Sequence, residues 1–313
     1  MSHHRLIPTL SALFAVIVWG GTFIATKIAL TEVSPATIVW VRFGVGVVIL
    51  GLAVLARHQF ALPAASDLAY LALLGFLGVT FHQWLQATGL QTARATTTAW
   101  IVATIPVFTA LFGWLVLKEP MGWKRVLGIA IAALGVILIV SDGNPKALFT
   151  GEAGNLGDLL ILISAVNWSV YTILSRRELT RQPAARMMFY VMLFGWLFTC
   201  AWVFGLGPGL SEIPRIDLKG WIALLTLGIF GSGLAYIAWY DALREIPASQ
   251  LGVFINIEPL VTTMLAAAMI NEPVTLITLT GGAVIIVGVW LVNWQEARRS
   301  ERSVTQPEEE AAD

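Results

Sequence analysis

The sequence alternates between long apolar stretches and short polar breaks along most of its length. A helix needs about 20 mostly apolar residues to cross the hydrocarbon core of a membrane. The apolar stretches predict ten transmembrane helices, at residues 6–30, 35–56, 68–88, 95–117, 122–140, 156–175, 184–206, 218–243, 248–270 and 275–294. The breaks carry proline, glycine and charged residues, as in KEPMGW and GPGLSEIPRID. We therefore expect an all-α integral membrane protein in which most neighbouring helices are antiparallel.

The composition supports a lipid environment and removes several function classes. Of the 313 residues, 57% are hydrophobic and 12% are charged, with a mean hydropathy of +0.79, whereas soluble domains carry about 25% charged residues. The formal net charge is zero, which gives no electrostatic basis for binding nucleic acid. Cys200 is the single cysteine, and the histidines lack metal-binding spacing. We expect no disulfide, no metal site and no cofactor.

The two ends of the chain differ in character. The first apolar run is too long for a signal peptide, and Lys27 and Glu32 close it instead of a small-residue cleavage site. It is therefore interpreted as the first span. Residues 295–313 are polar and charged, which predicts a disordered tail.

Basic residues in the short loops predict the orientation of the helices. With ten spans both termini lie on one side, and that side collects thirteen of the 19 basic residues: Arg5, Arg57, Lys118, Lys124, Arg125, Arg176, Arg177, Arg181, Arg186, Arg244, Arg298, Arg299 and Arg302. The opposite loops hold four, which are Arg94, Lys146, Arg215 and Lys219. Both termini are therefore expected in the cytoplasm.

The sequence contains an internal repeat. Residues 90–120 align without gaps on residues 243–273 at a shift of 153, which superimposes Pro106 on Pro259 and Glu119 on Glu272. Near the start of each half the shift is 149, and Trp19 falls on the position of residue 168. The repeat divides the chain into residues 6–140 and 154–294, with five spans in each half.

An odd number of spans per half implies that the second half enters the membrane upside down. Inverted repeats are a recurrent architecture of secondary transporters, which hold substrate near the midplane between the halves. One sequence unit then supplies two similar packings, so the inward-open and outward-open states are nearly equal in energy. The fold class expected is two inverted-topology five-helix repeats.

Several motifs resemble a known family. WGGTFIATKIAL, VRFGVGVVILGL and PVFTALFGWLVLKEP, together with NWSVYTILSRR and EPLVTTMLAAAMINEP in the second half, are similar to the EamA family of the drug/metabolite transporter superfamily. The resemblance covers residues 6–294. It implies a ten-span exporter of amino acids or related small metabolites in a bacterial inner membrane. Members of similar length and aromatic content include the YddG-type aromatic amino acid exporters, and these residues do not separate that subgroup from its siblings.

Glu258 is the strongest candidate for substrate contact. It precedes Pro259 in the middle of the ninth span, two residues after Asn256. Proline removes a helical hydrogen bond, so a carboxyl and an amide beside a weakened segment could hold a substrate ammonium or a proton. The alternative is a protonated glutamic acid that is hydrogen-bonded within the bundle. Its counterpart in the first half is Ile105, so the two halves are not chemically equivalent.

Aromatic residues fall in the middle of several spans. Trp19, Trp100 and Trp168 are mid-span tryptophans, and the first and last are repeat partners in the contexts WGGTF and NWSVY, which also hold Thr22 and Tyr171. Such rings could form apolar walls and a cation–π face for an ammonium. Packing between helices is the alternative for each of them. Together with Glu258 they suggest an amphipathic or aromatic zwitterion as substrate.

The third and eighth spans carry further polar groups. His82 and Gln86 lie four residues apart and share a helix face with Gly78, and Tyr236 stands in the eighth span. These groups would line a cavity if the two faces meet, although a membrane histidine is as often a packing residue.

Two cations also lie inside spans. The Lys27 side chain could extend to the membrane interface. For Arg42, a role in helix packing and a role in ligand binding are equally compatible with the sequence. Arg42 matches an arginine that the resembled family often carries there.

Secondary transport of a small molecule across the lipid bilayer is the leading hypothesis. The sequence has no P-loop and no clustered catalytic constellation, so neither ATP hydrolysis nor enzymatic activity is expected. An embedded enzyme, a passive channel and a transporter of drugs or sugars are the alternatives. The glycine-rich fifth and tenth spans are compatible with a monomer or a homodimer.

Overall fold

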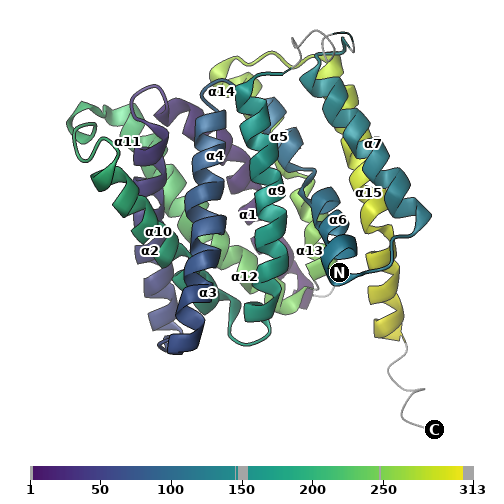
Figure 1. The fold of residues 1–313 in the computed structure, drawn as a ribbon, viewed down its shortest axis with the longest axis horizontal. Coiled ribbons are helices and arrows are strands. Elements are labelled where there is room, and N and C mark those ends of the chain that lie inside the picture. Colours follow the sequence, from purple (N-terminus) through teal and green to yellow (C-terminus); the bar gives the residue numbers. More distant parts are fainter. Residues whose placement is uncertain (1–2, 145, 147–153, 247, 306–313) are drawn as a thin grey trace.

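A computed structural model describes residues 3–144, 146, 154–246 and 248–305, and every regular element among them is helical. Among these residues ten helical spans are long and apolar enough to cross a membrane, which confirms the expected all-α architecture with ten candidate spans. The chain begins at the end of the bundle where α15 also ends (Figure 1). This end is called the N-terminal face below, and the opposite end the far face.

Three pairs of spans are unbroken helices. Their bounds are α1 His3–Ala29, α2 Pro35–Ala56, α7 Trp123–Val140, α9 Leu156–Leu179, α10 Ala184–Gly205 and α15 Leu276–Thr305. The last helix continues through residues 295–305, which belong to the segment expected as a disordered tail, and residues 306–313 of that segment lie outside the described residues.

The third and eighth spans contain wide, π-helical turns. In the third span η1 (Phe76–Phe81) joins α3 (Ala65–Gly75) to α4 (His82–Gly89). In the eighth span η3 (Thr226–Leu234) joins α11 (Leu218–Leu225) to α12 (Ala235–Glu245), after a short turn η2 at Ile213–Arg215. Such turns are often found at functional sites, and both occupy the middle of their spans.

The fourth and ninth spans are each split into two helices. The fourth consists of α5 (Ala95–Val102) and α6 (Ile105–Leu117), and the ninth of α13 (Ala248–Ile255) and α14 (Glu258–Ile270). Pro106 and Pro259 stand in the first turn of the second helix, where a missing N–H costs nothing. The sequence therefore places each break.

The breaks and turns recur at the shift of 153 residues found in the sequence. Lys118 and Asn271 both end their helices in the left-handed region, with φ of 55° and 52°. The N–H of the next residue, Glu119 or Glu272, donates to a carbonyl in the preceding turn at 3.1 Å in both cases. These paired irregularities agree with a two-repeat chain, while the inverted relation of the halves stays a prediction.

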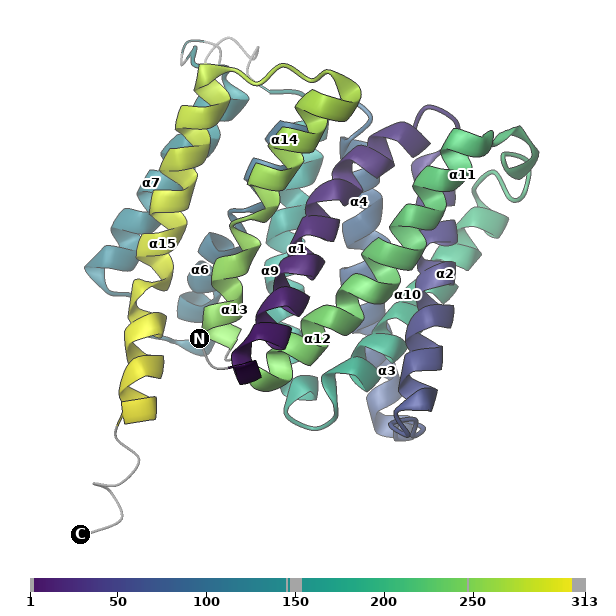
Figure 2. The same ribbon diagram turned by 180° about the vertical axis from the view of Figure 1, so that it is seen from behind.

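Two long helices occupy the middle of the bundle. α1 packs against α12 and α14, and α9 packs against α4 and α6. α7 and α15 lie side by side at one edge, and α2, α3, α10 and α11 form the other (Figures 1 and 2). The middle of the bundle is therefore where residues of the two halves meet.

Ion pairs hold helix ends together at the N-terminal face. Arg57 makes two contacts with Asp241, at 2.6 and 2.8 Å, and these hydrogen bonds raise the pKa of Arg57. Arg181 lies 3.0 Å from Asp67. Each pair connects two different spans.

The contact between α7 and α15 depends on glycine and yields a direct test. A Cβ on Gly128 would lie 2.6 Å from the Gly288 carbonyl oxygen, which belongs to the backbone and cannot move alone. We expect Gly128→Ala to cost about 1–3 kcal/mol by overpacking, measured as a lower midpoint of thermal unfolding in detergent.

The control is the same change at Gly205, whose Cβ would meet nothing within 4 Å. Alanine there should leave the midpoint unchanged or raise it slightly, because alanine is the better helix former. Equal midpoints for both variants would contradict close packing of α7 on α15.

Candidate functional site

A cluster of aromatic side chains lies between the two halves in the middle of the bundle. We call Trp19, Trp168, Tyr171, Tyr236 and Tyr240 the aromatic cluster, since all belong to one packed group. The Trp19 and Tyr236 rings meet edge to face with centroids 5.4 Å apart, and the Trp168 and Tyr171 centroids are 4.8 Å apart. Four of the candidates from the sequence are thereby brought together from α1, α9 and α12.

His82 of α4 joins this cluster from the side. Its ring centroid lies 4.5 Å from that of Trp168, and its Nδ1 is 3.1 Å from the Ser164 carbonyl oxygen. Gly78 lies one turn earlier, and a Cβ there would come within 2.7 Å of the Tyr171 ring. Glycine at 78 therefore lets α9 approach the third span closely enough for these rings to meet.

Arg42 of α2 is buried in the interior of the bundle. Its Nε donates to Ser232 Oγ at 2.8 Å, and its Nη1 donates to Gln83 Oε1 at 3.0 Å. The guanidinium carbon lies 5.2 Å from the Phe43 ring centroid. Among the described residues no carboxylate lies within ion-pair distance of this cation, although a charge in such surroundings is costly without a partner.

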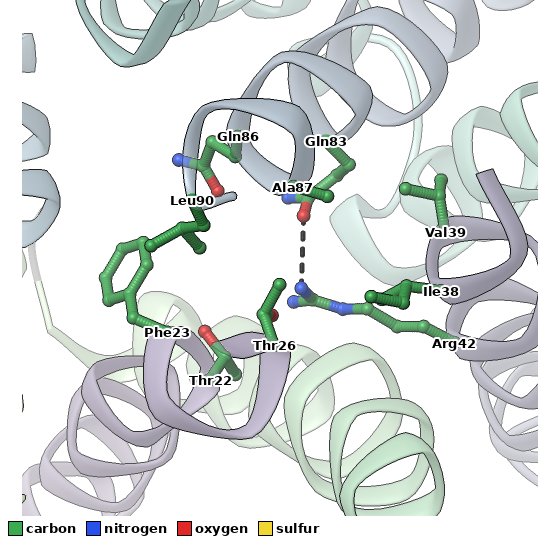
Figure 3. A pocket seen from close by; sticks show the side chains of 10 residues that line it. All are labelled: Thr22, Phe23, Thr26, Ile38, Val39, Arg42, Gln83, Gln86, Ala87 and Leu90. Carbon is green, nitrogen blue, oxygen red and sulfur yellow. Dashed lines mark hydrogen bonds between the residues drawn. The ribbon is translucent and has the colours of Figure 1, made fainter. Parts of the chain in front are cut away.

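A narrow pocket opens beside the Arg42 guanidinium. It lies between α1, α2 and α4 in the half of the bundle toward the far face, and Thr22, Thr26, Gln83 and Gln86 turn their side chains toward it (Figure 3). Phe23, Ile38, Val39, Ala87 and Leu90 complete the wall. The pocket thus joins polar donors and acceptors to an apolar rim, which is the usual composition of a small-molecule site.

Glu258 and Asn256 stand at the break between α13 and α14, and both are partly exposed. The Glu258 carbonyl accepts from the Thr262 hydroxyl at 2.9 Å. Its side-chain carboxyl has no hydrogen-bond or ion-pair partner among the described residues. The segment packs on α1, since a Cβ on Gly20 would lie 2.8 Å from the Glu258 carbonyl oxygen.

Tyr236 links these parts of the site. It follows Ser232, which holds Arg42, by four residues in the same span, and it belongs to α12, which packs on α1 as α14 does. Trp19, which packs on Tyr236, donates from Nε1 to the Gly231 carbonyl at 3.1 Å, next to the serine that holds Arg42. A buried cation, a free carboxyl and an aromatic wall therefore belong to one neighbourhood.

Trp100 lies apart from the other candidates. It is 2% exposed and packs in a separate group with residues of α7 and α15. A Cβ on Gly282 would overlap its ring, so α15 packs directly against it. Its Nε1 has no hydrogen-bond partner among the described residues. The structure does not bring Trp100 to the aromatic cluster.

With this geometry in view, comparison with known proteins identifies the family. The model of the EamA-like transporter family matches residues 6–141 and 155–294. The chain belongs to the EamA-like transporter family. The chain is therefore a multi-pass membrane transporter, in agreement with the family resemblance of its motifs.

Individual relatives agree with this assignment. An uncharacterized transporter of Archaeoglobus fulgidus is 30% identical over 275 residues, covering 88% of this chain and 93% of the relative. The uncharacterized transporter YyaM of Bacillus subtilis is 28% identical, with 86% and 88% covered. The uncharacterized inner membrane transporter YedA of Escherichia coli is 27% identical, with 93% and 92% covered.

A solved crystal structure also shares the fold of this EamA-like transporter. It covers 92% of this chain and 98% of its own, with a TM-score of 0.65 and 20% sequence identity. At that identity the likeness concerns the fold alone.

The sequence indicated that polar groups of the third and eighth spans could line a cavity, and Gln83, Ser232 and Tyr240 belong to these spans. Only the packing shows which of them face the pocket or the aromatic cluster. For Arg42, the sequence indicated a functional residue because its charge lies inside an apolar span.

The same substitution at two tryptophans tests this placement. Trp19→Phe removes the hydrogen bond to the Gly231 carbonyl, whereas Trp100→Phe removes an N–H that has no partner among the described residues. Loss of a hydrogen bond costs about 0.5–1.5 kcal/mol. We therefore expect Trp19→Phe to lower the midpoint of thermal unfolding more than Trp100→Phe, and the reverse order would contradict the hydrogen bond to Gly231.

Proposed function

We propose that this EamA-like transporter is a secondary-active exporter of amino acids or similar small metabolites, working by alternating access around a midplane cavity between two inverted halves. The observation that carries the proposal is an asymmetry between Glu119 and Glu272, which are equivalent under the repeat but make different contacts. The energy would come from solute or ion gradients, since the sequence has no nucleotide-binding loop.

At the far face Glu272 of the second half binds the start of α5 in the first half. Its carboxylate accepts from the backbone N–H groups of Ala95 and Thr96, at 3.0 and 2.9 Å, and from the Thr96 hydroxyl. An anion at a helix N-terminus is stabilised by the exposed N–H groups and the helix dipole. The end of α14 is therefore fastened to the start of α5, which is buried along its whole length.

At the N-terminal face Glu119 is engaged differently. Its carboxylate pairs with Arg176 at 3.2 Å and lies 3.8 Å from Arg125. α13, the counterpart of α5, is far less covered: of its residues 251–255 only Leu251 is buried, and Val253 is 63% exposed, against 2% for its counterpart Trp100. These differences support a state closed at the far face and open toward the N-terminal face.

Exchange of these two roles would give the opposite state. In that state Glu119 would leave Arg176 and cap the first turn of α13, while Glu272 would release α5. The breaks at residues 103–104 and 256–257 are suitable hinges, because each separates two short helices within one span. Two similar carboxylate latches of this kind would keep the two states close in energy.

The chemistry of the site supports an amino acid as the solute. We propose that the aromatic rings of Trp19, Trp168, Tyr171 and Tyr236 form the walls, that Glu258 receives the substrate ammonium, and that the remaining candidates supply polar contacts: Thr22, His82, Gln86 and Asn256. Trp100 would act only by holding α5 against α15. A free carboxyl beside aromatic faces suits an ammonium, through charge pairing and cation–π attraction.

We propose further that the chain lies in a bacterial inner membrane with both termini in the cytoplasm. The excess of basic residues at the N-terminal face supports cytoplasmic termini in a bacterial inner membrane. The structure would then correspond to an inward-open state that loads solute from the cytoplasm.

Counterflow in proteoliposomes tests the function. Vesicles loaded with one unlabelled amino acid and diluted into a trace of the same labelled amino acid should accumulate label transiently, because a carrier exchanges solute and a channel does not. We expect Glu258→Gln to lower this accumulation about tenfold or more, since loss of a charged contact costs about 1.5–3 kcal/mol.

A panel of the common amino acids provides the substrate, and empty vesicles provide the background. Glu245→Gln, which changes an exposed acid at the end of α12, is the matched control and should retain counterflow. Absence of counterflow with every amino acid would sink the proposed substrate class, and equal activity of Glu258→Gln would remove Glu258 from the site.

Cysteine labelling tests the two latches. Cys200 is the single cysteine, so Cys200→Ser gives a background for a reporter cysteine at Gln86, which lines the pocket near the far face. We expect Glu272→Gln to speed labelling of this reporter by a membrane-impermeant maleimide from the far face several-fold, because α5 loses its anionic cap. Glu119→Gln should leave it unchanged or slow it, and equal acceleration by both variants would contradict alternating latches.

A further inference from the structure

Arg42 differs from Arg57 and Arg181 in how the protein holds it. Arg57 and Arg181, at the N-terminal face, each pair with a carboxylate. Arg42 is 6% exposed and has only neutral partners, Ser232 and Gln83, among the described residues. Burial of a cation without a carboxylate partner in a membrane bundle costs several kcal/mol. The position of Arg42 beside a pocket suggests that a ligand offsets this cost.

The guanidinium has unused hydrogen-bonding capacity. Arginine carries five N–H donors, and the hydrogen bonds to described residues use only Nε and Nη1. The remaining terminal nitrogen, Nη2, lies 3.5 Å from where a Cβ on Gly231 would stand. Absence of a side chain at residue 231 therefore leaves the open end of the guanidinium uncovered.

Other polar groups around the pocket are also available to a ligand. The Gln86 amide, the Gln83 Nε2 and the Thr26 hydroxyl make no hydrogen bond to a described residue, and all three residues line the pocket. Amide N–H and hydroxyl groups that converge with a guanidinium on one space are suited to an anion (Figure 3).

We propose that Arg42, with Gln83, Gln86 and Thr26, forms an anion subsite that takes the carboxylate of the transported molecule. This assignment rests on the proposed transport function and specifies one end of its substrate. The hydrogen bonds to Ser232 and Gln83 fix the plane of the guanidinium, so that its free N–H groups point into the pocket. The guanidinium is thus preorganised for binding by its hydrogen bonds to residues on neighbouring helices.

A carboxylate fits this subsite better than a phosphate does. Arg42 is the one cation among the pocket residues, so it balances a single negative charge, and its planar end matches the two oxygens of a carboxylate. A phosphate dianion would keep an uncompensated charge in a low-dielectric space.

The position of the subsite gives the substrate a direction. Gly231 adjoins both Arg42 and Trp19, so a molecule whose carboxylate meets Arg42 has its next atoms beside the aromatic cluster. Glu258 lies near the same cluster, because its carbonyl oxygen is 2.8 Å from where a Cβ on Gly20, the neighbour of Trp19, would stand. A substrate with an anionic end, a cationic centre and an apolar body is therefore matched at three points.

The test compares ligands that differ only in charge. Binding of L-phenylalanine and L-phenylalaninamide, and of phenylacetate and phenylacetamide, is measured on the purified full chain in nanodiscs by ligand-induced thermal stabilisation. At about pH 6 both amino compounds keep the ammonium. We expect the wild type to prefer the carboxylate of each pair at least about tenfold, and Arg42→Gln to abolish that preference while amide binding changes less than about threefold.

Further variants separate binding from folding. Arg42→Lys should recover part of the preference, because it keeps the charge but not the planar fork. Arg57→Gln changes the arginine at the other end of the same helix and should keep the full preference. A merely structural Arg42 would weaken the two members of each pair equally.

Three results would overturn the assignment: no carboxylate preference in the wild type, an unchanged preference in Arg42→Gln, or stabilisation by inorganic phosphate as strong as that by phenylacetate. Counterflow that proceeds without a carboxylate preference would remove the anion subsite and leave the transport proposal standing. Absence of counterflow with every amino acid would remove the transport proposal, and the phenylacetate pair would still decide whether the pocket selects anions.

Discussion

Hydrocarbon offers no hydrogen-bond partner, so every interruption of a helix and every charge inside the bundle must be satisfied within the protein. The fold follows from this constraint. Two unbroken helices, α1 and α9, occupy the middle of the bundle, and the split fourth and ninth spans pack against them, so that α1 and α9 can cover the freed backbone groups. Glycines at 20 and 78 permit the close approach of α1 and α9 to the irregular segments.

The same constraint explains how much of the fold could be predicted from the sequence. Spans are readable because each must be apolar over about 20 residues, and the splits at Pro106 and Pro259 are readable because proline lacks an N–H. The wide turns at Phe76–Phe81 and Thr226–Leu234 were not foreseen. They arise from packing between spans, which leaves no local signal beyond the glycines at 78 and 231.

The candidate site was only partly predictable for a related reason. Mid-span position indicates depth in the membrane but not the direction in which a side chain points. Trp19 and Trp168 met in the aromatic cluster, whereas Trp100, at a similar depth, faces α15. Arg42 was visible as an intramembrane charge, but its lack of a carboxylate partner is a property of the packed bundle. That missing partner, and not the charge alone, connects Arg42 with a ligand.

The two halves share a scaffold but not their charges. Glu258 falls on Ile105 in the other half, and Arg42 falls on Val191 or Gly195 according to which shift applies to the second span. Each half thus contributes one charge of opposite sign. A site with full two-fold symmetry would accept a zwitterion equally well in two opposite directions. Under the proposed function, a cation from the first half and a carboxyl from the second leave one favourable direction, while the repeated breaks and latches still provide two states of similar energy.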